Sequence, residues 1–147
     1  MDTKAAQKKQ KAICLVVFAL YVLIVLYLTI FRYDFHYDER QLNLTLFIDL
    51  IKVFRNVGAG EFLWLFLGNI GWFVPFGFLL PMLQKKKSLL IVMVAGLAFS
   101  FLIETLQFLT YKGVAELDDL ILNTLGAAIG YLLYKASQRI RKSARFR

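Results

Sequence analysis

The chain has 147 residues, 59% of them hydrophobic, and a mean hydropathy of +0.61. A soluble domain needs more polar residues to cover its surface, so this composition argues against a soluble protein and favours a membrane protein. A net charge of +8 would fit a nucleic-acid-binding protein, but the basic residues lie at the ends of apolar runs, so we expect no nucleic-acid partner.

The first apolar run, residues 12–31, has no charged residue and is long enough to cross a bilayer, which takes about 20 residues. It follows Lys8, Lys9 and Lys11 but lacks the small-residue cleavage site of a signal peptide, so we expect an uncleaved helix. The outer loop that follows, residues 32–61, is too charged to cross the bilayer.

Apolar residues recur at helical spacing within this outer loop and predict a short interfacial helix: Phe47, Leu50, Ile51, Phe54 and Val57. Polar and charged residues take the opposite face: Asp49, Lys52, Arg55 and Asn56. An amphipathic connector without a function of its own is the alternative interpretation.

The second run, residues 62–83, contains Asn69 and Pro75. Pro75 is expected to kink the helix, because proline lacks a backbone donor and clashes with the preceding turn. The third run, residues 88–110, carries Glu104 and Gln107 inside an otherwise apolar stretch.

The fourth run, residues 117–134, carries Asp118, Asp119 and Asn123 near its start. A loop of about six residues, 111–116, joins the third and fourth runs, so the two helices should be antiparallel neighbours. The sequence therefore predicts one domain with an all-α fold: a bundle of four transmembrane helices with a short interfacial helix in the first outer loop.

The basic residues also predict the orientation of this bundle. Four precede the first span, three follow the second and six lie from Lys135 onward, so thirteen of the 18 Lys and Arg residues share one side. That side is expected to be cytoplasmic, which places both termini on the cytoplasmic side of the bacterial cytoplasmic membrane. The basic tail, residues 135–147, would lie near anionic lipid head groups.

Three predicted helices place polar groups at one depth in the outer half of the bundle. Glu104 lies about six residues from the outer end of its helix, which is roughly 9 Å at about 1.5 Å of rise per residue. Asn123 lies about six residues, and Asn69 about seven residues, from the start of its own helix. Two stripes at helical spacing carry them, one with Gly96, Ser100, Glu104 and Gln107, the other with Asp119, Asn123, Gly126 and Gly130. The small residues of each stripe allow close helix approach.

A carboxylate inside a span is costly unless it is protonated, paired or solvated, so Glu104 requires an explanation. One interpretation is a hydrogen-bond knot in which Glu104, Gln107, Asn69 and Asn123 satisfy one another. The other is an outward-facing cavity that recognises a polar group of a ligand. The two interpretations are compatible.

Asp118 and Asp119 start the fourth predicted helix, where a carboxylate is favoured by the helix dipole, and one of them is expected to be a cap. Only Asp119 shares the face of Asn123, which makes it the better site candidate. Lys112 could pair with these carboxylates or could simply be solvated. One His and one Cys offer no zinc site, and no cofactor motif is present, so we expect neither a metal nor a cofactor.

Two blocks of the sequence resemble the VanZ-like family, which is named after a protein linked to resistance against the glycopeptide teicoplanin. They are GNIGWFVPFGFLLP at 68–81 and the segment from ETLQ at 104–107 to DDLILNTLGAAIG at 118–130, with NLTLF at 43–47 ahead of them. The resemblance marks the positions Asn69, Pro75, Phe76, Gly77, Glu104, Gln107, Asp119, Asn123 and Gly126. The chain has Lys112 where relatives usually have an arginine, and a lysine lacks the planar fork that binds carboxylates or phosphates in a bidentate way.

These observations favour a non-enzymatic envelope protein that contributes to glycopeptide resistance or envelope homeostasis. It would bind a membrane lipid, a lipid-linked cell-wall precursor or the antibiotic itself through an outward cavity. The candidate ligand-binding residues are Asn69, Glu104, Gln107, Lys112, Asp119 and Asn123, and the candidate structural residues are Pro75, Phe76, Gly77, Gly126 and Gly130. The alternatives are an intramembrane enzyme or proton-coupled transporter that uses Glu104 and Asp119, and a structural accessory subunit.

Overall fold

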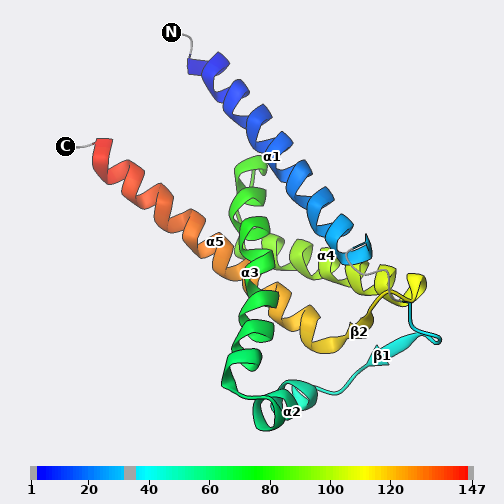
Figure 1. Ribbon diagram of the computed structural model, residues 1–147. Helices are drawn as coiled ribbons and strands as arrows, with labels where there is room; N and C mark the ends of the chain where they lie inside the picture. Colours follow the sequence, from blue (N-terminus) through cyan, green and yellow to red (C-terminus); the bar gives the residue numbers. More distant parts are fainter. Residues whose placement is uncertain (1–2, 32–35, 146–147) are drawn as a thin grey trace.

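The fold is known from a computed structural model that describes residues 3–31 and 36–145 (Figure 1). The first residues of the predicted outer loop, 32–35, and the end of the tail, 146–147, lie outside the described residues. The elements in chain order are α1 (Thr3–Phe31), β1 (Gln41–Asn43), α2 (Ile48–Asn56), α3 (Ala59–Leu83), α4 (Leu89–Thr110), β2 (Val114–Glu116) and α5 (Leu117–Arg145). The predicted all-α class is confirmed.

Three of these helices are long and apolar enough to cross a membrane: Ala5–Ile30 of α1, Ala59–Leu83 and Leu89–Thr110. The fourth predicted span, in α5, is not among them; that helix carries Asp118, Asp119 and Asn123 near its start and the basic tail at its end. The count of four spans therefore stays a prediction.

Two helices extend far beyond the predicted apolar runs, and α3 begins three residues before its own run, at Ala59. α1 begins at Thr3, and α5 continues without a break through the basic tail to Arg145. Lys, Arg and Gln are good helix formers, so the polar ends propagate each helix outside its apolar part. The tail is therefore a helical extension of α5.

The connection between α4 and α5 contains a strand where a simple loop was predicted. β1 and β2 pair in parallel, with Gln41 opposite Val114 and Asn43 opposite Glu116. The backbone N–H of Tyr37 also donates to the carbonyl of Tyr111 (2.8 Å). The outer segment is thereby hydrogen-bonded along the α4–α5 connection.

Glycines bring α3 and α5 into backbone contact. A Cβ atom at Gly126 would overlap the carbonyl oxygen of Ile70, and one at Gly130 would overlap that of Val74. Gly77 of α3 meets the backbone of Ala127 in the same way. The two helices pack this closely because all three positions lack a side chain.

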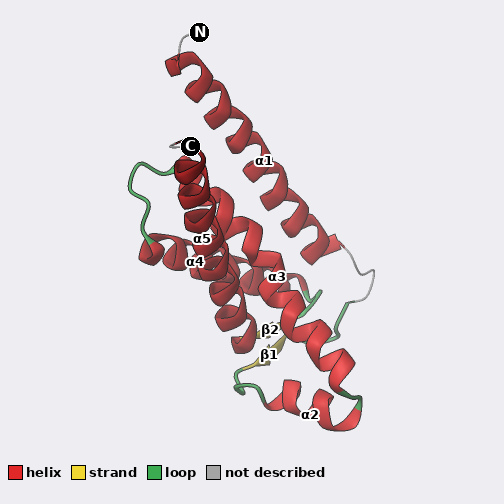
Figure 2. Cartoon of the chain, turned by 90° about the vertical axis from the view of Figure 1, so that its left-hand side faces the viewer, coloured by secondary structure: helices red, strands yellow, loops and turns green. Residues whose placement is uncertain are grey.

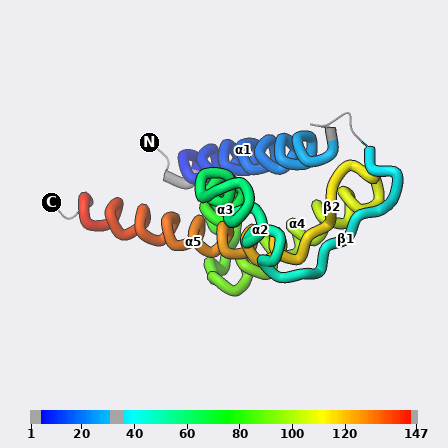
Figure 3. The backbone as a smooth tube through the Cα atoms, turned by 60° about the horizontal axis from the view of Figure 1, so that its bottom comes forward, coloured from blue at the N-terminus to red at the C-terminus, as the bar shows by residue number. Residues whose placement is uncertain are grey.

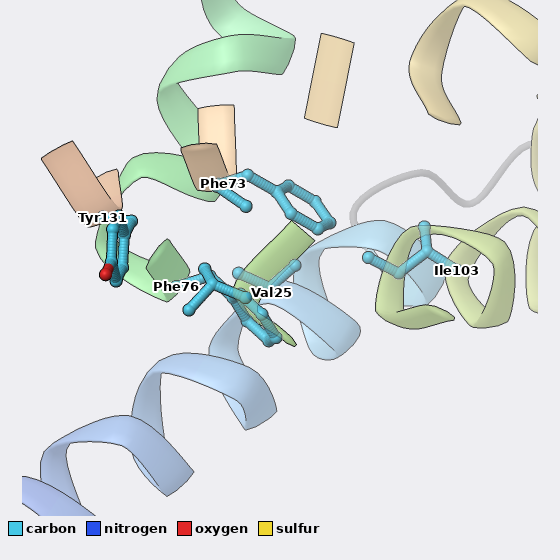
Figure 4. Packing of buried hydrophobic residues seen from close by; sticks show 7 residues of the cluster. Val25, Phe73, Phe76, Ile103 and Tyr131 are labelled. Atoms are coloured by element: carbon cyan, nitrogen blue, oxygen red, sulfur yellow. The ribbon is translucent and has the colours of Figure 1, made fainter. Parts of the chain in front are cut away.

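Aromatic residues form the core beside this contact. Phe73 and Phe76 of α3 are buried with Val25 of α1, Ile103 of α4 and Tyr131 of α5 (Figure 4). α3 continues through Pro75. The Tyr21 hydroxyl of α1 donates to the Trp72 carbonyl of α3 (2.5 Å), which ties α1 to α3 beside this core.

The chain ends and the outer segment mark opposite ends of the molecule. Both described chain ends lie at one end of the molecule, whereas α2 and the two strands lie at the other (Figure 2). α1 runs along one side of the group and packs chiefly on α3 (Figure 3). The α4–α5 connection and the outer segment therefore meet at the end remote from the termini.

Candidate functional site

A cavity of about 450 Å³ lies among α1, α3, α4 and α5 near the strand pair. All six residues that the sequence marked as ligand-binding candidates line it: Asn69, Glu104, Gln107, Lys112, Asp119 and Asn123. Val25, Phe73 and Ile103 from the aromatic core form apolar parts of its wall. The cavity thus has a mixed lining, with polar side chains of three helices on one part and apolar side chains of the core on another.

Asp119 links α5 to two other helices. Its carboxylate accepts a hydrogen bond from the Asn69 amide of α3. Its backbone carbonyl accepts one from the Ser100 hydroxyl of α4 (3.5 Å), and the same Ser100 oxygen accepts the Asn123 amide (2.9 Å). Ser100 and Asn123 are both buried. These bonds fix the first turns of α5 against α3 and α4.

Glu104 is 5% exposed, and its Oε2 atom accepts the backbone N–H of Glu116 (2.9 Å). Glu116 ends β2, so the strand presents this donor directly to the helix α4. A carboxylate in an apolar helix needs such a donor, because burial without a partner is costly.

Gln107 is held differently. Its amide lies against Gly113, where a Cβ atom would stand 2.9 Å from Nε2. Its Oε1 atom is buried and has no hydrogen-bond partner within the described residues. Buried acceptors without a partner are rare in folded proteins, and this oxygen is free to accept a hydrogen bond.

The hydrogen bonds differ from those of the predicted knot. Asn69 bonds to Asp119, Asn123 to Ser100 and Glu104 to Glu116. None of these three uses another of the four knot residues as its partner. The polar groups are therefore oriented by neighbouring segments, and the cavity lies between them.

Asp118 binds the outer segment. Both of its carboxylate oxygens accept the backbone N–H of Phe47, at 2.9 and 3.0 Å. Phe47 precedes α2 with a left-handed backbone (φ 55°), an uncommon conformation for a non-glycine residue. The sequence predicts that one of the two aspartates caps α5. Within the described residues, the Asp118 carboxylate instead bonds to Phe47 and the Asp119 carboxylate to Asn69.

The sequence matches the model of the VanZ/LLP1 family over residues 18–139. The chain belongs to the VanZ/LLP1 family. It is 31% identical to Protein VanZ of Enterococcus faecium over 127 residues, which cover 82% of this chain and 73% of that protein. No solved structure matches the chain.

The part that matches the VanZ/LLP1 family includes all six polar cavity residues and both blocks on which the resemblance rested. The predicted family is therefore confirmed. Together with the three apolar helices, membership identifies the chain as a membrane protein.

Sequence reasoning missed the cavity residues outside the polar stripes. Thr29 of α1, Tyr37 of the outer segment and Trp72 of α3 also line the cavity. Trp72 lies in the block GNIGWFVPFGFLLP, on which the VanZ resemblance rests, so the sequence could have marked it as a site residue. No sequence feature marks Tyr37, because its position depends on the pairing of the outer segment with the α4–α5 connection.

A second hollow borders the cavity. Glu104 also lines an apolar groove of about 240 Å³, whose wall includes Leu42, Leu44, Phe101, Phe108, Leu117 and Leu120. Phe101 is 62% exposed, so the groove lies on the outer surface of the helices. The cavity and the apolar groove therefore have the Glu104 side chain in common.

Two carboxyl groups near the strand pair have shifted pKa values. Partial burial raises the pKa of the Glu116 carboxyl, the Asn43 amide opposes this by hydrogen bonding, and the nearby Asp118 and Asp49 raise the pKa further. The Lys52 ammonium next to Asp49 (2.5 Å) lowers the pKa of that exposed carboxyl. In the described part of the chain, no three His, Cys, Asp or Glu side chains are grouped to hold a metal ion.

Proposed function

We propose that this VanZ/LLP1 protein contributes to glycopeptide (teicoplanin-like) resistance or envelope homeostasis by binding an amphipathic envelope molecule. The carrying observation is that six polar residues from α3, α4, α5 and their connection line one cavity, in which Gln107 keeps an unpaired buried acceptor. Candidate ligands are a lipid, a lipid-linked cell-wall precursor and the glycopeptide itself.

The cavity is proposed to open toward the outside of the bacterial cytoplasmic membrane. Two observations support this orientation: the chain ends lie together at one end of the molecule (Figure 1), and most Lys and Arg residues flank that end. The first half of α5 then acts as the fourth span. Its polar first turns would be tolerated because they face the other helices instead of lipid.

α2 is proposed to lie in the outer membrane interface. Ile48, Ile51 and Phe54 of α2 are about half exposed, and Phe54 packs against Phe62 at the start of α3, with ring centroids 5.6 Å apart. A short amphipathic helix of this kind lies flat with its apolar residues in the acyl boundary.

The groove next to the cavity supports an amphipathic ligand. Glu104 lines both hollows, so a ligand whose polar group contacts Glu104 would have the apolar side chains of Leu117 and Phe101 close by for its apolar part. Sites for lipid-like molecules combine an apolar lining with a few oriented polar groups, as this one does.

A resistance assay tests the proposal. A glycopeptide-sensitive host that expresses the protein should gain tolerance, and Glu104→Ala or Asp119→Ala should abolish it while the amount of protein in the membrane stays unchanged. Glu61→Ala serves as the matched control, because this carboxylate lies outside both hollows on the exposed first turn of α3. Tolerance that survives both cavity variants would contradict the site.

A further inference from the structure

A second large cavity, of about 480 Å³, lies at the opposite end of the molecule, beside the chain termini. It is bordered by the start of α1, the end of α3, the loop before α4 and the second half of α5. The proposed envelope-ligand site lies at the remote end, so this cavity is a separate feature.

Two helices turn a continuous stripe toward it. Gln7, Lys11 and Cys14 of α1 follow one another at four and three residues, as residues on one helix face do. On α5, Gln138 lies four residues after Tyr134, and Arg141 and Lys142 lie three and four residues after Gln138. The cavity is therefore formed by matched helix faces, so its lining is set by the packing of the fold.

The charges around this cavity have one sign. Lys11, Lys87, Arg141 and Lys142 line it together with the amides of Gln7, Gln10 and Gln138, and no carboxylate lines it within the described residues. Four cations that converge without a counter-charge repel one another, so an anion that enters the cavity is stabilised.

Lys87 is positioned at the cavity wall by two buried tyrosines. Its backbone carbonyl accepts the Tyr131 hydroxyl (2.9 Å), and its ammonium group lies 5.3 Å from the centre of the Tyr134 ring. Both tyrosines are less than 10% exposed. A held lysine loses less side-chain freedom on binding an anion than a free surface lysine does.

We infer that this cavity binds a phosphate group, in which Lys11, Lys87, Arg141 and Lys142 supply the charge. Arg and Lys are the side chains that proteins use for phosphate, and several N–H donors suit its oxygens. The phosphate could belong to an anionic membrane lipid or to a soluble phosphate, because both offer the same group.

Matched triple variants of the full chain test this inference. The site variant is Lys11→Gln/Lys87→Gln/Arg141→Gln. The control variant, Lys9→Gln/Lys86→Gln/Arg139→Gln, removes the same charge from neighbouring residues that do not line the cavity. Binding of phosphatidylglycerol is measured by titration into the protein in phosphatidylcholine nanodiscs, and inorganic phosphate is titrated separately.

The site variant should bind about a hundredfold more weakly than wild type, because each lost basic group near a phosphate removes about a factor of five. The control variant should bind as wild type does. Affinity for phosphatidylglycerol alone identifies a lipid, and affinity for inorganic phosphate identifies a soluble source. Equal weakening in both variants, or no binding of either probe to wild type, would overturn the inference.

Folding is checked by thermal unfolding in phosphatidylcholine. If the triple site variant unfolds, two single variants replace the triple ones: Arg141→Gln for the site and Arg139→Gln as the control. Both arginines are exposed, so neither change should unfold the protein. Arg141→Gln should then weaken binding about fivefold, and an unchanged affinity would count against the cavity.

Discussion

Asp119 illustrates how single residues organise the candidate site. Its carboxylate bonds to α3 through Asn69, and its backbone carbonyl bonds to α4 through Ser100. The residue is only partly exposed at the start of α5. Its partners therefore decide whether a charge at this position stabilises or destabilises the bundle.

Asn69→Leu should destabilise the protein, because it leaves the Asp119 carboxylate without its amide partner. A loss of about 1–3 kcal/mol in the free energy of unfolding is expected from the unsatisfied group. Thermal unfolding in detergent measures it, and Asn56→Leu on the exposed end of α2 is the control. The double variant Asn69→Leu/Asp119→Leu should recover part of the loss, and a further loss would argue against this bond.

Glu116 should make the stability depend on pH. Burial raises its pKa in the folded state above the unfolded value of about 4.3, so the folded protein binds the proton more tightly. The associated stability is fully present below the unfolded pKa and is lost as the pH rises through the folded pKa.

Glu116→Gln should therefore flatten this decline in an unfolding series that starts near pH 4 and goes upward. Glu61→Gln, on the exposed first turn of α3, is the control. A variant at Glu116 that leaves the slope of stability against pH unchanged would contradict the assigned cause.

The polar residues of the site could be predicted from the sequence, but their bonds could not. Glu104, Gln107 and Asn123 are conspicuous because each interrupts an apolar run, and a membrane leaves few positions for such groups. Their partners depend on packing: Glu104 accepts a backbone N–H from β2, which no side-chain pattern reveals. The same holds for the bond from Phe47 to Asp118, across 71 residues.

At the scale of elements, the contact between α3 and α5 is set by backbone proximity. Gly126 and Gly130 of α5 touch carbonyl oxygens of α3, and Gly77 of α3 touches the backbone of α5. The spacing of Gly126 and Gly130 is visible in the sequence. The family resemblance marks Gly77 as well, but its contact with the Ala127 backbone follows only from the fold. The short strands were not predictable, because three-residue segments carry no periodic signal and pair over a long separation.

Gly126→Ala should weaken this contact. The added Cβ would overlap the Ile70 carbonyl and would stand 3.0 Å from Phe73 Cβ, so the helices must separate. The expected cost is about 1–3 kcal/mol or more in the free energy of unfolding.

Gly68→Ala is the matched control on α3, because a Cβ there meets nothing within 4 Å. It should be neutral or stabilising by up to about 1 kcal/mol, since alanine favours a helix. Thermal unfolding in detergent compares the two, and a Gly126→Ala protein as stable as Gly68→Ala would contradict the close contact.

At the scale of the whole molecule, the two large cavities divide the bundle into unlike ends. Carboxylates and amides line the cavity near the strands, with Lys112 at its rim, whereas four basic residues line the cavity near the termini. The sequence predicted this polarity from charge placement. The cavities themselves could not be predicted, because their walls combine segments that only the fold brings together.

The central claim is that the cavity near the strands binds an amphipathic envelope molecule. The protein is purified gently from its own membrane, and mass spectrometry identifies the molecules that remain bound to wild type, Gln107→Met and Gln84→Met. Both glutamines have a buried Oε1 atom without a partner among the described residues, but only Gln107 lines this cavity. We expect one amphipathic molecule to remain with wild type and Gln84→Met and to be lost from Gln107→Met. Equal retention by all three proteins, or no specific molecule with wild type, would contradict the claim.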